Sequence, residues 1–424
     1  MNIRKLIKNL NFSPSKEELK FLEEKTKEIV EKLKREIVKN KFDADVFVGG
    51  SFAKGTLAKE EDYDIDIFIR FGWKEQEHLS EQLEKIVEGL DMLSKKVHGS
   101  RDYFRVSEWD NLTFEIIPVL RIKRVGEAQN VTDQSYFHVN YVRRKIKGKL
   151  NSEVALAKTF FKCNGIYGAE SYINGFSGYG IECLIINYGS FEKMLKSLVK
   201  VKKSERLIID PKKHYKKKEE ILFNLNESKI HGPIILVDPT WKERNVLAAL
   251  SGGTFEKFQE IALKFLSKPS EKFFYMKKLD VGNIKAIAKK RKAEFLHLIL
   301  ETNRQEGDIA GTKMKKFSNF LTGELKKYFD ILESEFDYKG AGNKAEIYFV
   351  LKSKKEIVRI GPPIKMEKSV KEFKRKNKET FEKNGFMHSR VKIDFSAADF
   401  LKNYFVENKG KLGEMGIVGI EFRD

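Results

Sequence analysis

The stretch from residue 46 to residue 69 constrains the fold more than any other part of this sequence. It begins as an apolar strand, Val46-Phe47-Val48, passes through the turn Gly49-Gly50-Ser51, and continues with residues that can open a helix. Such a turn presents bare backbone N–H groups and a hydroxyl to a phosphate, because glycine lets an anion approach closely. Lys54 can add its charge one turn later. The turn predicts a phosphate-binding role for Gly50, Ser51 and Lys54, although most glycine turns after strands are only turns.

The strand that follows carries two aspartates in alternation with isoleucines. Asp64 and Asp66 are two residues apart, so they project from one face while the isoleucines fill the other. Two carboxylates this close repel each other unless a cation lies between them. This repulsion argues against the alternative that they only form the solvent-exposed face of an ordinary strand. Glu115 interrupts a later apolar strand and is the candidate for a third carboxylate. These three residues are therefore the predicted metal ligands and catalytic residues.

Hard oxygen ligands of this kind suit Mg²⁺, which is commonly held by a few carboxylates together with substrate phosphates. In a two-metal scheme, one ion lowers the pKa of the attacking 3′-hydroxyl and the other stabilises charge on the α-phosphate and on the departing pyrophosphate. The predicted reaction is nucleotidyl transfer from a nucleoside triphosphate, with two Mg²⁺ ions as cofactors. Asp62 and Asp64 fit the same pattern in a shifted register, but the isoleucine alternation favours Asp64 and Asp66.

Composition bounds the class of protein. The chain has 424 residues, 82 Lys and Arg against 62 Asp and Glu, and a net charge of +20, which raises affinity for polyanions and makes nucleic acid the first partner to consider. A lysine-rich protein without such a partner is an equal alternative on charge alone. Cys163 and Cys183 are too few for a disulfide framework, and no signal peptide or membrane span is visible. We expect a cytoplasmic protein without a membrane partner.

The periodicity of apolar residues predicts an α+β multidomain protein. A capping-box pattern at Ser15 and Glu18 opens an amphipathic helix over residues 15–40, and helical spacing recurs over residues 79–97. Helices are also predicted at residues 155–164 and 181–199. The predicted strands are residues 45–48, 65–69, 103–106, 114–120 and 234–237. The predicted domains are residues 1–133, which hold the carboxylates, a helix-rich domain at 134–267, and an α+β region at 268–424.

A basic run extends from residue 193 to residue 218, interrupted by Ile208-Ile209. It can follow a phosphate backbone or form a solvated loop, and the sequence alone favours the loop.

One motif resembles the signature of the polymerase-β-type nucleotidyltransferase superfamily. It consists of Gly50-Ser51 followed, after twelve residues, by Asp64-Ile65-Asp66-Ile67. Further stretches resemble archaeal, class I CCA-adding enzymes over nearly the whole chain. These stretches are Ser135-Tyr136-Phe137-His138, Lys158, Lys162-Cys163-Asn164-Gly165-Ile166-Tyr167-Gly168-Ala169-Glu170, Gly175-Phe176-Ser177-Gly178-Tyr179, Tyr188-Gly189-Ser190-Phe191, Asp238-Pro239 and Arg244-Asn245-Val246, with a weaker match at Gly361-Pro362 and Val370-Lys371-Glu372-Phe373.

The resemblance implies a nucleotidyltransferase head, a helix-rich neck, and a C-terminal body and tail. It implies template-independent addition of C, C and A to the 3′ end of tRNA from CTP and ATP, with release of pyrophosphate. It also implies that His138, Lys158 and Tyr167 contact the triphosphate or ribose, although each has an ordinary structural alternative. Arg244 would read the base, because a guanidinium can donate to acceptors that cytosine and adenine share.

The resemblance further implies that basic residues hold the acceptor and TΨC arms of tRNA through phosphates; these include Lys289, Lys290, Arg291 and Lys292. Glu115 departs from the aspartate that is more usual in related enzymes, and we expect activity to survive this change. The alternatives are a poly(A) polymerase or oligoadenylate synthetase-like enzyme, and a catalytically silent RNA-binding protein of the same fold. The sequence leaves the oligomeric state open between monomer and homodimer.

Overall fold

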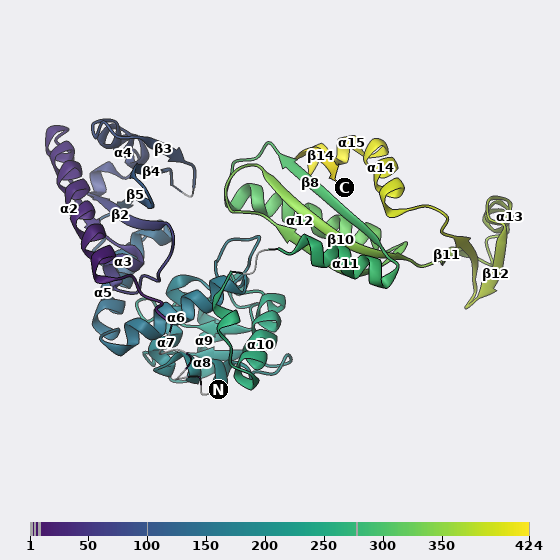
Figure 1. Ribbon diagram of the computed structural model, residues 1–424, viewed down its shortest axis with the longest axis horizontal. Helices are drawn as coiled ribbons and strands as arrows, with labels where there is room; N and C mark the ends of the chain where they lie inside the picture. Colours follow the sequence, from purple (N-terminus) through teal and green to yellow (C-terminus); the bar gives the residue numbers. More distant parts are fainter. Residues whose placement is uncertain (1–2, 4–5, 7–9, 100, 277–278, 424) are drawn as a thin grey trace. The chain divides into compact units, whose positions relative to one another are not determined.

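The computed structural model describes residues 3, 6, 10–99, 101–276 and 279–423 (Figure 1). The chain forms two compact units, residues 1–277 and residues 278–424. Within the described ranges, no helix is both long enough and apolar enough to cross a membrane.

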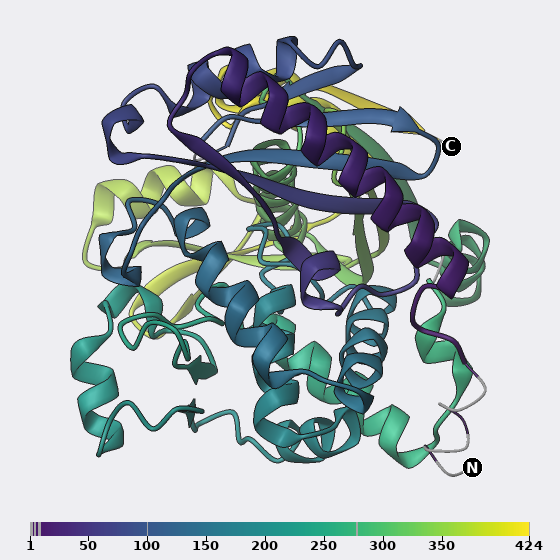
Figure 2. The same cartoon turned by 90° about the vertical axis from the view of Figure 1, so that its left-hand side faces the viewer.

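The first unit begins with a five-stranded mixed sheet in the order β1-β2-β5-β4-β3. β2 and β5 run parallel, and the other neighbouring strands run antiparallel. The predicted helix at residues 15–40 is confirmed as α2, with both hydrogen bonds of the capping box between Ser15 and Glu18 present. Figure 2 shows α2 lying along one face of the sheet. The elements are α2 (Lys16–Lys39), β1 (Ala44–Val48), α3 (Gly50–Lys54), β2 (Tyr63–Phe71), α4 (Leu79–Glu88), β3 (Ser94–Val97), β4 (Tyr103–Trp109) and β5 (Leu112–Leu120).

The predicted alternation of β2 is confirmed. Ile65, Ile67 and Ile69 are fully buried in the core that the sheet forms with α2 and α4. Their burial fixes the register of the strand, because a slip by one residue would place the aspartates in the apolar core. Asp64 and Asp66 therefore lie on the opposite face of the sheet.

The predicted helix at residues 79–97 is only half correct. α4 ends at Glu88, Asp91 adopts a positive φ of 51°, and the chain returns as the edge strand β3. Leu93, which completed the helical spacing, is 76% exposed. The edge strand Ser94-Lys95-Lys96-Val97 is so polar that its apolar residues show neither helical nor strand-like spacing. The sequence therefore gives no signal that the helix has ended, and the predicted helix extends too far.

The rest of the first unit is mostly helical, with the short parallel strand pair β6 and β7. Its core is rich in phenylalanine, including Phe160, Phe161 and Phe258. The predicted helix at residues 155–164 is confirmed within α6, and the predicted strand at 234–237 is confirmed as β7. The elements are α5 (Ser135–Lys145), α6 (Lys149–Cys163), α7 (Gly178–Tyr188), α8 (Phe191–Leu198), β6 (Leu207–Ile209), α9 (Lys218–Asn224), β7 (Ile234–Leu236) and α10 (Gly252–Ser267), with 3₁₀ turns at Val125–Glu127, Val131–Gln134, Glu227–Lys229 and Glu271–Phe274. A further 3₁₀ turn, Trp73–Glu75, connects β2 to α4.

The prediction of one helix over residues 181–199 is wrong, because two helices occupy it. Gly189 ends α7 with a φ of 76°, and the Ser190 side chain accepts a hydrogen bond from the Lys193 backbone N–H to begin α8. Glycine at a left-handed C-cap followed by a serine N-cap is a stop and a start signal. The apolar residues on both sides masked this break.

The second unit contains a four-stranded antiparallel sheet in the order β14-β8-β10-β9, and a three-stranded sheet in the order β11-β13-β12. One face of the larger sheet packs on α12 and α14, and α11 packs on its other face through Ile284 and Tyr348. The elements are α11 (Val281–Arg291), β8 (Glu294–Thr302), α12 (Asp308–Leu325), β9 (Phe329–Asp337), β10 (Lys344–Ser353), β11 (Glu356–Pro363), α13 (Glu367–Lys376), β12 (Glu379–Lys383), β13 (Phe386–Lys392), α14 (Ala397–Glu407), α15 (Lys409–Glu414) and β14 (Ile417–Arg423).

Candidate active site

A cavity of about 310 Å³ lies where α3 and β2 meet the helices α5, α6 and α7 in the first unit. It brings together most of the residues that the sequence predicts for nucleotide binding, together with one of the predicted carboxylates. Asp64, Glu115 and Arg244 are not among its lining residues. The lining residues are Gly50, Ser51, Lys54, Asp66, Phe68, Ser135, His138, Val139, Lys158, Tyr167, Gly178, Tyr179 and Glu182.

The glycine turn lies directly against Asp66. Gly50 has a positive φ of 59°, and a Cβ atom added to it would stand 1.7 Å from Asp66 Oδ2. The backbone N–H of Gly49 donates a hydrogen bond to the Asp66 carbonyl oxygen at 2.8 Å. A side chain at position 50 would therefore displace the aspartate, so glycine is needed both for its conformation and for the close approach.

The three predicted carboxylates come from two adjacent strands. Asp66 on β2 pairs with Glu115 on β5 in the parallel register. Burial raises the pKa of Asp66 to about 6, and the negative charges of Glu115 and Asp64 add to this increase. Burial also raises the pKa values of Asp64 and Glu115. The like charges destabilise one another, as the sequence predicts for Asp64 and Asp66.

Glu115 has a cationic partner. Arg105, which faces it from β4, donates to Glu115 Oε1 from Nε at 2.9 Å and approaches the same oxygen with Nη2 at 2.8 Å. Among the residues that the structure describes, no three His, Cys, Asp or Glu side chains converge closely enough to hold a metal ion. Even so, the donor set fits a divalent cation, because hard carboxylate oxygens repel one another around Asp66 and a cation would relieve that repulsion. Glu115 would have to turn from Arg105 to join such a site.

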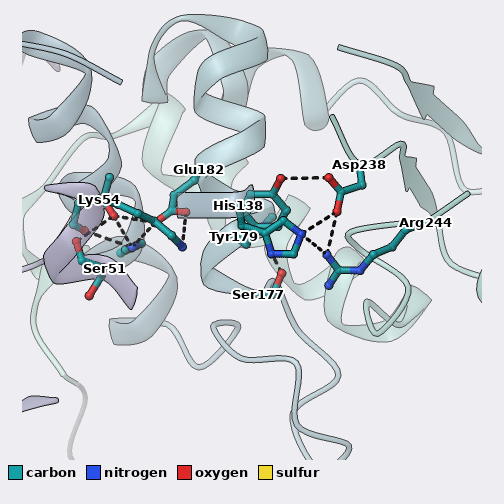
Figure 3. A network of polar contacts seen from close by, with 11 residues as sticks. Ser51, Lys54, His138, Ser177, Tyr179, Glu182, Asp238 and Arg244 are labelled. Atoms are coloured by element: carbon teal, nitrogen blue, oxygen red, sulfur yellow. Dashed lines mark hydrogen bonds and ion pairs between the residues drawn. The ribbon is translucent and has the colours of Figure 1, made fainter. Parts of the chain in front are cut away.

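A buried ionic cluster forms the floor of the cavity (Figure 3). Glu182 on α7 is fully buried and accepts hydrogen bonds from Lys54 Nζ at 2.9 Å, Lys158 Nζ at 2.8 Å and Thr56 Oγ1 at 2.6 Å. Burial by itself would raise the pKa of Glu182, but the two ammonium groups and these hydrogen bonds outweigh it and hold the pKa at about 2. Glu182 is therefore an ionised carboxylate that joins α3 to α6 and α7.

Lys158 is buried and fully engaged by the protein. Besides its bond to Glu182, its ammonium group donates to the Thr56 carbonyl oxygen at 3.1 Å and lies 3.2 Å from Thr56 Oγ1. Burial lowers the pKa of Lys158, and the neighbouring charge of Lys54 adds to the decrease. An ammonium group has three donors, so Lys158 can reach a phosphate only by giving up one of these partners.

A second network centres on the buried carboxylate of Asp238, which follows β7 (Figure 3). Asp238 Oδ2 lies 2.8 Å from Arg244 Nη1 and 3.1 Å from His138 Nε2. Asp238 Oδ1 accepts bonds from the Tyr179 hydroxyl at 3.0 Å and from the Thr240 backbone N–H at 2.7 Å. Burial opposes ionisation, but these partners outweigh it and hold the pKa of Asp238 well below its usual range.

His138 links this network to the cavity. Its ring stacks on Tyr179 with a centroid separation of 4.1 Å, and its Nε2 lies 3.1 Å from Arg244 Nη1. Burial lowers the pKa of His138, and the nearby charges of Arg244 and Lys54 act in the same direction. Arg244 itself lines an adjacent hollow of about 620 Å³ that also contains Gln129 and Trp241. The network therefore lies between the two hollows, with Arg244 on the side away from the glycine turn.

Sequence reasoning did not identify Glu182, Tyr179 or Asp238 as site residues. Glu182 did carry a signal, since it is an acidic residue within the apolar stretch Gly180-Ile181-Glu182-Cys183-Leu184-Ile185. A charge in such a stretch is rarely buried without a partner. The same reasoning identified Glu115 in its apolar strand.

Two domain families match successive parts of the first unit. A family described as a nucleotidyltransferase domain matches residues 15–147, and one described as tRNA nucleotidyltransferase, second domain, matches residues 152–275. Among solved structures, a cytoplasmic RNA terminal U-transferase is similar with a TM-score of 0.49 and 14% identity, over 65% of this chain and 98% of that chain. This similarity is too low to support an argument about function.

Curated relatives extend over both units. The CCA-adding enzyme of Nanoarchaeum equitans is 31% identical over 93% of this chain and 94% of its own length. The CCA-adding enzyme of Methanosarcina acetivorans is 29% identical over 78% of this chain and 72% of its own length. That of Sulfurisphaera tokodaii is 33% identical over 64% of this chain and 61% of its own length. Both nucleotidyltransferase domain families match this chain, β2 carries the paired aspartates of the polymerase-β type, and one relative aligns with the chain over 93% of its length. The chain therefore belongs to the CCA-adding enzyme family.

Proposed function

We propose that this protein adds C, C and A to the 3′ end of tRNA, using CTP and ATP and releasing pyrophosphate, in the cytoplasm. The observation that carries the proposal is that the glycine turn, Asp66 and Lys54 line one and the same cavity. The chain also aligns with a CCA-adding enzyme over 93% of its length. The phosphate-binding features lie at one end of this cavity. The Asp238 network, which holds Arg244, lies at the other.

In this proposal the triphosphate lies against Gly50 and Ser51, and Lys54 neutralises part of its charge. His138, Lys158 and Tyr167 all line the same cavity, so all three are proposed to contact the triphosphate or ribose. Such transfer generally depends on divalent cations, and we propose two Mg²⁺ ions held by Asp64, Asp66 and Glu115. When bound, these ions would activate the 3′-hydroxyl and stabilise the negative charge of the transferred and departing phosphates.

The tRNA would be held mainly through its phosphates, because an A-form helix is recognised by shape and backbone. Lys289, Lys290, Arg291 and Lys292 are exposed at the C-terminal end of α11. We propose that they contact the acceptor and TΨC arms.

The direct test is incorporation of each of the four nucleotides, with Mg²⁺, onto a tRNA transcript that lacks its last three residues and onto one that ends in C-C. We expect two C additions on the first transcript, and a single A on the second. A run of A, or 2′-5′ linkage, would identify the poly(A) polymerase or oligoadenylate synthetase-like alternatives. RNA binding with no incorporation would contradict the proposal and leave the silent RNA-binding alternative.

Arg244 is expected to set nucleotide choice. Replacing Arg244 by Ala should reduce the preference for CTP and ATP over UTP and GTP by roughly 5- to 150-fold, because a well-placed pair of hydrogen bonds to a base discriminates by about 1–3 kcal/mol. Asp238→Asn should change the same ratio in the same direction, since Asp238 orients the guanidinium. Lys242→Ala, an exposed substitution two residues away, is the matched control. Equal kcat/KM ratios for all three variants and wild type would remove Arg244 from base selection.

A further inference from the structure

A second hollow, of about 760 Å³, lies on the other side of α5 from the cavity. Ser135, His138 and Val139 line the cavity, whereas Asn140, Arg143 and Arg144 line the second hollow. We call the second hollow the basic groove. Its lining residues are Tyr136, Phe137, Asn140, Tyr141, Arg143, Arg144, Lys147, Lys212, His214, Pro239 and Thr240.

The basic groove carries positive charge that the protein does not neutralise. Arg143, Arg144, Lys147 and Lys212 are exposed, and none of them forms an ion pair within the described part of the chain. Arg144 donates to the Asn140 carbonyl oxygen at 3.1 Å. None of the lining residues is acidic. Positive charge gathered in a concave surface produces a focused potential that attracts polyanions.

Aromatic rings lie among these cations. Tyr136 is 37% exposed, its ring lies 4.4 Å from the Arg70 guanidinium carbon, and it packs edge-on against Phe137. The ammonium group of Lys212 stands 5.6 Å from the centroid of the buried Tyr141 ring. Cations that contact phosphates, beside an exposed aromatic ring such as that of Tyr136 on which a base can stack, are the combination that binds RNA strands. An acidic peptide would use the charge, but its carboxylates would gain nothing from the exposed part of the Tyr136 ring.

The groove is held in shape by the protein itself. Its two walls are a helix and the loop after β6, and the loop is fixed to the chain beyond β7. His214 Nε2 lies 3.3 Å from the Pro239 carbonyl oxygen, and Tyr215 donates its hydroxyl hydrogen to the Lys242 carbonyl oxygen at 2.9 Å. A site that is formed before its ligand arrives loses less conformational entropy on binding.

We propose that the basic groove is an RNA-binding surface that contacts phosphates of the tRNA outside the catalytic cavity. The inference that the ligand is RNA comes from the charged and aromatic residues of the groove. The inference that this RNA is tRNA rests on the proposed function. The proposal assigns a role to part of the basic run at residues 193–218, for which the sequence favours a solvated loop. Lys212 and His214 from that run line the groove.

The test is the affinity of the full chain for a tRNA transcript that lacks its last three residues, measured over a range of salt concentrations. The groove variant carries Arg143→Gln, Arg144→Gln and Lys212→Gln. The control variant carries Lys34→Gln and Arg35→Gln, an adjacent exposed basic pair on α2, together with Lys213→Gln, which neighbours Lys212 but does not line the groove. Both variants lose three charges, so a general loss of attraction affects them equally.

We expect the groove variant to bind tRNA on the order of tenfold more weakly than the control variant. Its plot of log Kd against log salt should also be flatter, by about one for each tRNA phosphate that the variant no longer neutralises. The KM for tRNA should rise while the KM for CTP stays unchanged, which a misfolded variant would not show. Affinities of the two variants within twofold of each other would overturn the proposal. If the wild-type protein adds neither C nor A while the groove variant still binds tRNA more weakly than the control variant, the proposed function is refuted and the groove is supported.

Discussion

Asp66→Ala is expected to incorporate CTP and ATP about a thousandfold or more slowly than wild type, while its affinity for tRNA stays the same. Asp66 is the one predicted carboxylate that lines the cavity, and it stands directly against the glycine turn. Removing it would take away a ligand for the divalent cations that stabilise charge in the transition state, and a thousandfold loss corresponds to about 4 kcal/mol. The measurement is single-turnover incorporation at saturating CTP.

Asp62→Ala is the matched control, because Asp62 is exposed just before β2 and belongs to the shifted register that the sequence also permits. It is expected to retain full activity. Loss of activity in Asp62→Ala together with an active Asp66→Ala would mean that the carboxylate register has been assigned wrongly.

The stability of an Asp66 variant shows whether its loss of activity comes from a missing metal ligand or from unfolding. Burial and neighbouring carboxylates raise the pKa of Asp66 from 3.8 to about 6 in the folded protein. A raised carboxyl pKa means that the folded state holds the proton more tightly than the unfolded state, so this contribution to stability is complete below pH 3.8 and is lost as pH rises to about 6. At pH 7 without divalent cations, Asp66→Asn should therefore melt at a higher temperature than wild type. A lower Tm would contradict this account of Asp66.

Glu182→Gln is expected to destabilise the first unit by about 3–5 kcal/mol, because it leaves Lys54 and Lys158 in a buried place without their counter-charge. For a unit of this size, the loss corresponds to a decrease in Tm of roughly 6–20 °C. The amide keeps the shape of Glu182, so the effect comes from the charge. Where the variant remains folded, the KM for CTP should rise, because the two lysines are no longer fixed at the floor of the cavity.

A double-mutant cycle with Lys158→Met tests the same cluster. Lys158→Met removes one buried cation, so it should restore part of the stability that Glu182→Gln loses, and the two effects should not add. Glu192→Gln on α8 is a matched control, because the half-buried Glu192 pairs with the exposed Lys196 one helical turn away. A Glu182→Gln protein that melts like Glu192→Gln would show that the buried cluster contributes little to stability.

The sequence predicted the β2 strand and the side to which its aspartates point, because alternation has a period of two residues and the isoleucines need a core. It also predicted the glycine turn with Lys54, and the family resemblance added His138, Lys158 and Tyr167, which line the same cavity. The break at Gly189 was visible as a glycine followed by a serine, but the apolar spacing of α7 and α8 concealed it. The metal, nucleotide and tRNA roles of the predicted residues stay predictions.

The partners of the buried charges were decided only by the tertiary structure. Lys54 and Glu182 are 128 positions apart, and His138 and Asp238 are 100 positions apart. No local sequence pattern can therefore predict that these residues are in contact. The family resemblance implies that Lys158 contacts the nucleotide, but only the structure reveals that its ammonium group is bound to Glu182 and Thr56. Local pattern fixes which face of a strand or helix a side chain occupies. Which charge neutralises which depends on how the helices α5, α6 and α7 pack against the sheet, because a buried ion is stable only beside a counter-charge that folding brings to it.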